Sequence, residues 1–191
     1  MTKITLQTGA LALFILLAAF SRIIPHPPNF SPLAAIGLFG AAHFAKRWQA
    51  FLLSLAAVWV SDLFINNVIY GQYSPTFTWF YDGFYWQYGS YLLITGCGVR
   101  LFSKSISLPK VLGGALGAGA LFFLISNFGC WLGSTIYPQN MAGLMSCYAA
   151  GLPFYSGTFL GDMCYSALLF GGYYLLQKNF SFLKLSHIKY A

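Results

Sequence analysis

Long apolar stretches, interrupted by very few charges, constrain this sequence more than any other feature. Hydrophobic residues make up 58% of the 191 residues and charged residues only 7%, whereas charged residues make up about 25% of soluble domains. A bilayer core of about 30 Å requires roughly 20 apolar residues per helix, and backbone groups must pair within the spanning segment. The sequence therefore predicts an all-α membrane protein with a single transmembrane domain over residues 1–191.

Six apolar segments predict the transmembrane helices. They cover residues 5–24, 33–45, 49–71, 84–103, 110–136 and 153–177, and a short basic tail follows at 178–191. The second segment is too short to cross a bilayer alone. Proline disfavours helical geometry, and four prolines lie in Ile24–Pro32 just before this segment. We interpret Ile24–Pro32 as an irregular, re-entrant stretch that lines a cavity; an ordinary surface loop is the alternative.

The distribution of lysine and arginine predicts the orientation of these helices. With a cytoplasmic N-terminus, nine basic residues fall on the inner side and only Arg22 on the outer side. The inner ones are Lys3, Lys46, Arg47, Arg100, Lys104, Lys110, Lys178, Lys184 and Lys189. Cytoplasmic loops are enriched in such residues, so both termini are expected inside. The formal charge of +7 then reflects topology and contact with anionic lipid, and we expect no nucleic-acid partner.

The chain contains three acidic residues, Asp62, Asp82 and Asp162, and two of them interrupt apolar runs. A carboxylate inside a membrane is costly and usually functional, so Asp62 and Asp162 mark the candidate site. The predicted topology gathers polar residues in the outer half of the bundle. The predicted substrate-binding residues are Arg22, His26, Asn29, Asp62, Asn66, Asn127 and Asp162. Arg22 is expected to pair with Asp62 or with Asp162, and interhelical staples are the alternative reading of these groups.

The sequence offers little evidence for catalysis or for a metal. It contains no C-x-x-C, G-x-S-x-G, H-E-x-x-H or P-loop pattern, and its histidines and cysteines lack metal-ligand spacing. We therefore expect no catalytic residue, no metal and no cofactor. Two alternatives stay open: an intramembrane enzyme that uses Asp62 and Asp162 as a carboxylate pair, and a disulfide between Cys130 and Cys147 in an oxidising compartment.

Aromatic residues crowd the predicted outer loops, above all residues 70–86. Most of them are expected in the interfacial aromatic belt, and a lid over a flat ligand is the second reading. Closely spaced glycine and alanine residues at 113–119 would let another helix approach, either within the bundle or from a partner protein.

Several motifs together resemble an uncharacterised family of small bacterial membrane proteins that is labelled as transport proteins. They are the segment from Arg22 to Pro32, Ser61-Asp62, Ser126–Trp131, Tyr137-Pro138, Leu152-Pro153-Phe154 and Gly161-Asp162. The resemblance covers about residues 15–175. That family is similar to the S components of energy-coupling-factor (ECF) vitamin transporters, which are substrate-binding membrane subunits.

The resemblance implies a bundle of six helices in the bacterial inner membrane, with both termini inside and an outward-facing pocket roofed by the outer loops. It also implies docking on a membrane coupling subunit that carries ATPases. We therefore expect a protein that captures a small molecule, such as a vitamin or vitamin precursor, for uptake. The alternatives are an intramembrane enzyme and a structural or assembly protein.

Overall fold

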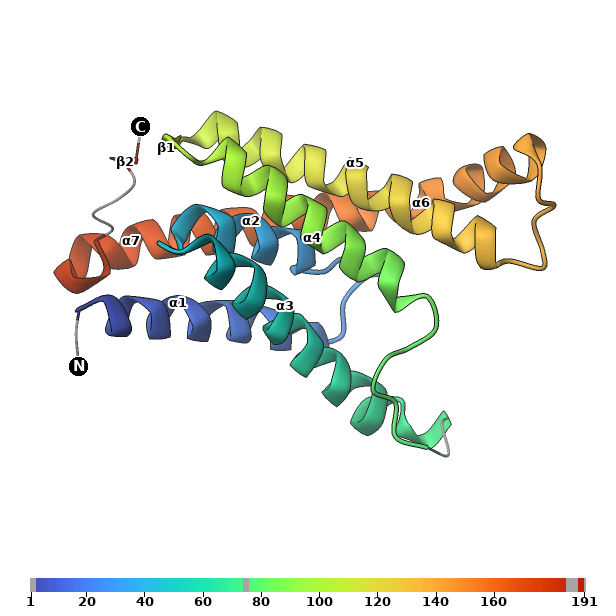
Figure 1. The fold of residues 1–191 in the computed structure, drawn as a ribbon, viewed down its shortest axis with the longest axis horizontal. Helices are drawn as coiled ribbons and strands as arrows, with labels where there is room; N and C mark the ends of the chain where they lie inside the picture. The colour runs from blue at the N-terminus through green and yellow to red at the C-terminus, as the bar shows by residue number, and fades with distance from the viewer. Residues whose placement is uncertain (1–2, 74–75, 185–188, 191) are drawn as a thin grey trace.

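A computed structural model describes residues 3–73, 76–184 and 189–190, and it is a bundle of helices (Figure 1). Three helical stretches are long and apolar enough to cross a membrane, namely Leu6–Ile23, Arg47–Ile69 and Leu108–Gly133. The shorter helix Leu33–His43 is also apolar. The predicted class, an all-α membrane-embedded bundle, is confirmed.

The N-terminal part of the bundle alternates long helices with short irregular pieces. Its elements are α1 (Lys3–Phe20), η1 (Ser21–Ile23), α2 (Leu33–His43), α3 (Arg47–Phe64), the π-helical η2 (Ile65–Ile69) and η3 (Gly71–Tyr73). The segment Ile24–Pro32, called the Pro-rich segment below, lies between η1 and α2.

The C-terminal part contains the two longest helices. Its elements are α4 (Phe84–Leu101), β1 (Ser105–Ile106), α5 (Leu108–Gly133), α6 (Met141–Ser166), the π-helical η4 (Ala167–Gly171), α7 (Gly172–Asn179), η5 (Ser181–Leu183) and β2 (Lys189–Tyr190). The predicted tail thus includes β2, which pairs in parallel with β1. Helix α1 begins and α7 ends at the same end of the bundle (Figure 1).

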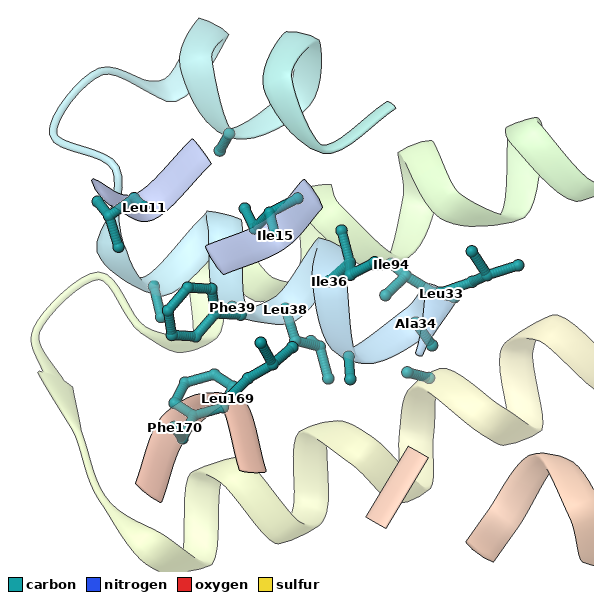
Figure 2. Packing of buried hydrophobic residues seen from close by; sticks show 14 of the residues in the cluster. Leu11, Ile15, Leu33, Ala34, Ile36, Leu38, Phe39, Ile94, Leu169 and Phe170 are labelled. Carbon is teal, nitrogen blue, oxygen red and sulfur yellow. The ribbon is translucent and has the colours of Figure 1, made fainter. Parts of the chain in front are cut away.

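Helix α2 forms the centre of the bundle although it is the shortest of the apolar helices. All eleven of its residues are buried. Phe39 packs its ring against Phe14 of α1 at 5.7 Å between centroids and against Phe170 of η4 at 5.5 Å. Figure 2 shows these α2 side chains between Leu11 and Ile15 of α1 and the Leu169–Phe170 pair. Helix α2 is thereby held inside the bundle.

The first five predicted segments agree with the observed helices to within a few residues, but the start of the sixth was wrong. The apolar run alone had predicted a start at residue 153. Helix α6 instead begins at Met141, because the Asn140 side chain caps it by accepting a hydrogen bond from the Gly143 amide at 2.9 Å. Pro153 lies inside the helix, as neighbouring helices allow in membranes. Tyr148, predicted in a loop, is helical and donates to the Leu124 carbonyl of α5 at 2.8 Å.

Candidate functional site

A cavity of about 240 Å³ lies where η1, the Pro-rich segment and the first turn of α2 meet α4, α5 and α6. Four of the predicted site residues line it: Arg22, His26, Asn29 and Asp162. Side chains of opposite charge, amides and aromatic rings therefore surround one space. Its lining residue Arg22 directly follows α1, and α1 ends away from the end of the bundle where it begins (Figure 1).

The Pro-rich segment forms one wall through a tight turn. The Phe30 amide donates to the Pro27 carbonyl at 3.1 Å, with Pro28 and Asn29 between them. Asn29 has φ of 61°, which asparagine tolerates better than most residues and which defines a type II turn after proline. His26 Nδ1 donates to the Pro27 carbonyl at 2.9 Å. Because that carbonyl can only accept, the neutral ring keeps Nε2 as an acceptor.

Two glycines of α6 hold this turn against the bundle. A Cβ atom at Gly157 would meet the Pro28 carbonyl oxygen, and one at Gly161 would lie 2.7 Å from the Ser31 amide nitrogen. The obstructing atoms belong to backbone and cannot rotate away. The Gly157-x-x-x-Gly161 spacing puts both glycines on one face of α6, so the Pro-rich segment lies directly on that helix.

Arg22 pairs with Asp62, one of the two partners that the sequence allowed. Arg22 Nη1 lies 2.6 Å from Asp62 Oδ1 and donates to Ser61 Oγ at 2.9 Å. The Tyr88 hydroxyl of α4 donates to Asp62 Oδ2 at 2.6 Å. Both oxygens of this buried carboxylate are thus bonded, as a buried charge requires. Asp62 does not itself line the cavity, and the cluster ties η1, α3 and α4 together.

The aromatic loop before α4 is fixed to the π-helical end of α3 by Asn67. The Thr78 amide donates to Asn67 Oδ1 at 2.6 Å, and Asn67 Nδ2 donates to the Thr78 carbonyl at 2.9 Å. Burial raises the pKa of the Tyr81 hydroxyl in this loop, and the nearby charge of Asp62 adds to the rise. The neighbouring Asn66, which we predicted in the site, is not among the residues that line the cavity.

Asp162 differs from Asp62 in having no bonded partner for one of its oxygens. The residue is 3% exposed, and Oδ2 has no hydrogen-bond partner in the described part of the chain. Gly119 of α5 leaves room for it, because a Cβ atom there would lie 3.0 Å from Oδ2. Thr158, one turn earlier on α6, lines the cavity as well. Most buried polar groups in proteins are paired, so this carboxylate requires an explanation.

Two aromatic rings form another part of the wall, and the sequence reasoning missed them. Tyr91 of α4 and Phe122 of α5 stack with centroids 5.7 Å apart and planes 4° apart, and Gln87 lines the cavity one turn before Tyr91. These residues look like ordinary helix residues in the sequence. The available signal was spacing: Gln87 and Tyr91 are four residues apart, as are Thr158 and Asp162, which puts each pair on one helix face.

A second cavity of about 240 Å³ adjoins the first and shares Asn29, Gln87, Phe122 and Thr158 with it. Asn127, the remaining predicted site residue, lines this second cavity and not the first. Its side-chain amide donates to the Phe123 carbonyl at 2.8 Å. The thiol of Cys147 donates to the Asn127 backbone carbonyl at 3.4 Å. Cys130 and Cys147 are both free thiols in the structure.

The bundle and its cavity define a membrane-embedded helical protein with a candidate site for a small ligand. Residues 2–184 match the model of a family of unknown function (DUF6580), and the chain belongs to that family. No curated protein and no solved structure matches the chain. Within residues 3–73, 76–184 and 189–190, no three His, Cys, Asp or Glu side chains gather in a way that could hold a metal ion.

Proposed function

We propose that the protein captures a small molecule in this cavity from the outer side of the bacterial inner membrane and delivers it for uptake. The proposal includes six membrane crossings with both termini inside. In this proposal α4 and α6, with 18 and 26 residues, each cross the membrane once. The short α2 crosses it together with the Pro-rich segment. The basic residues of the turns after α2 and α4 then face the cytoplasm.

The observation that carries the proposal is the buried Asp162 carboxylate in the wall of a cavity, with one oxygen that has no partner in the described residues. A group placed there only to hold helices together would bond to another helix, as Asp62 does with Arg22 and Tyr88. An orphaned carboxylate that lines an open space is suited to a ligand group instead. A catalytic pair of Asp62 and Asp162 fits less well, because both oxygens of Asp62 are already bonded.

The resemblance of the sequence motifs to a family that is similar to ECF S components suggests a mechanism for this proposal. The Pro-rich segment would close over the ligand, and the bundle would then release it inward against a membrane coupling subunit with ATPases. The sequence has no P-loop, so the energy would come from that partner or from an ion gradient. The ligand class in this reading is a vitamin or vitamin precursor.

Native mass spectrometry of protein purified gently from its own host tests the proposal. We expect a defined small-molecule adduct on the wild type that is lost in Asp162→Asn. The matched control is Asp82→Asn, the same chemical change at an exposed loop position outside the cavity, which should keep the adduct. Folded wild-type protein that never carries an adduct, from the host or from a vitamin mixture, would favour the structural alternative.

A further inference from the structure

One acidic residue of the cavity wall, Asp162, has no ion pair in the described residues. Apart from tyrosines, its ionisable lining residues are Arg22, His26 and Asp162. The charge of Arg22 is compensated by Asp62 at 2.6 Å. His26 is exposed, and its Nδ1 is bonded to the Pro27 carbonyl. Asp162 has no ion pair in the described residues, so an ionised Asp162 would need its counter-charge from a ligand.

The surroundings of Asp162 favour a positive partner from outside the chain. Leu33 and Ala34 in the first turn of α2 line the same cavity, and a helix N-terminus carries roughly half a positive charge. That dipole offsets part of the negative charge of the carboxylate but supplies no full counter-charge. An unpaired carboxylate in a low-dielectric site is strongly stabilised by a hydrogen-bonded cation.

The aromatic wall restricts the shape of that partner. Tyr91 and Phe122 stack in parallel and line the same cavity as Asp162, and aromatic rings bind flat rings and cations. Asn29 and Gln87 add amide groups that can orient a polar substituent.

We propose that the ligand of this cavity is a small flat molecule with a protonated amine, and that Asp162 is its counter-ion. The amine donates to the Asp162 carboxylate, and the ring lies against Tyr91 and Phe122. This inference rests on the proposed function, because it names the chemical class of the captured molecule.

Matched sets of ligands that differ only in charge test the inference. The probes are tryptamine, tryptophol and indole-3-acetate, together with phenethylamine, 2-phenylethanol and phenylacetate. Binding to the full chain in lipid nanodiscs is measured by microscale thermophoresis. We expect at least one amine to bind roughly tenfold more tightly than its alcohol, since a charge-assisted hydrogen bond is about twice as strong as a neutral one. Asp162→Asn should remove that preference, and Asp82→Asn should keep it.

Tighter binding of the alcohol or the acid than of the amine would overturn the inference, and so would failure of both amines to bind. An amine preference that survives in Asp162→Asn would overturn the role of Asp162. The wild-type series decides the charge preference even if the variant does not fold. The proposed function is judged separately by the native adduct: an uncharged or anionic adduct that depends on Asp162 would keep the uptake function and reject the cationic class.

Discussion

The two buried aspartates of the bundle occupy opposite situations. Asp62 has both oxygens bonded, to Arg22 and to Tyr88, whereas Asp162 has an oxygen with no partner in the described residues. Asp62 therefore fixes the relative positions of η1, α3 and α4, whereas we propose that Asp162 meets a ligand that enters the cavity. A buried carboxylate in a membrane helix indicates function only after its partners are known.

The largest effect on stability is expected from Arg22→Met. Loss of the guanidinium leaves Asp62 buried without its counter-charge, which costs about 3–5 kcal/mol. Unfolding in mixed micelles with increasing SDS measures the change. The double variant Arg22→Met/Asp62→Leu should recover much of the loss, because no buried charge is then left unpaired. A double variant as unstable as the sum of the single changes would show that the ion pair does not govern this part of the fold.

A smaller loss of stability is expected from Gly161→Ala. Gly161 lies next to Asp162 on α6 and packs against the Pro-rich segment, which follows Arg22, the partner of Asp62. The added Cβ atom would lie 2.7 Å from the Ser31 amide nitrogen, and overpacking of this kind costs about 1–3 kcal/mol. The same unfolding assay measures it, and ligand binding should weaken because the cavity wall moves. Gly117→Ala is the control, since a Cβ atom there meets nothing within 4 Å. Equal effects at both glycines would argue against tight contact between the segment and α6.

Tyr88→Phe separates the hydrogen bond on Asp62 from its ion pair. The substitution removes one hydroxyl that donates to Asp62 Oδ2 at 2.6 Å, and a hydrogen bond to a charged group contributes about 1.5–3 kcal/mol. We expect a loss near the lower end, about 1.5 kcal/mol, because Arg22 still compensates the charge. The SDS unfolding midpoint provides the measurement. An unchanged midpoint would mean that Arg22 alone satisfies Asp62.

The smallest effect on stability is expected from Asp162→Asn, although its effect on binding is large. No bond to Asp162 Oδ2 is lost, so the free energy of unfolding should stay within about 1 kcal/mol of the wild type or rise. The unfolding assay without ligand gives this value. A destabilisation as large as that of Arg22→Met would show that Asp162 has a structural role like that of Asp62.

The sequence was sufficient to predict the helices but not their rotation about their own axes. Apolar runs located the helical segments, and the cost of buried charge selected Arg22, Asp62 and Asp162. Asn66 and Asn67 are adjacent in a π-helical turn, and only the structure shows that Asn67 holds Thr78. Tyr91 and Phe122 were missed for the same reason, because a ring in a membrane helix can face lipid or cavity alike.

The start of α6 shows a second limit of sequence reasoning. The predicted start at residue 153 lies thirteen residues after the Asn140 cap. Packing of α6 along α5, through Tyr148 on the Leu124 carbonyl, decided for the earlier one. The local sequence does not show which contacts with neighbouring helices satisfy the backbone groups that a proline inside a helix leaves free.

The shortness of α2 has an electrical consequence. Its eleven residues rise about 16 Å, roughly half of the hydrocarbon thickness of about 30 Å. Water that filled the cavity down to Leu33 would bring the outer electrical potential to that depth, so the membrane voltage would fall mainly across the inner half of the protein. A cation that moved from Asp162 to the cytoplasm would then gain nearly the full voltage, about 2.3 kcal/mol per 100 mV. The inside-negative membrane would itself pull such a ligand inward.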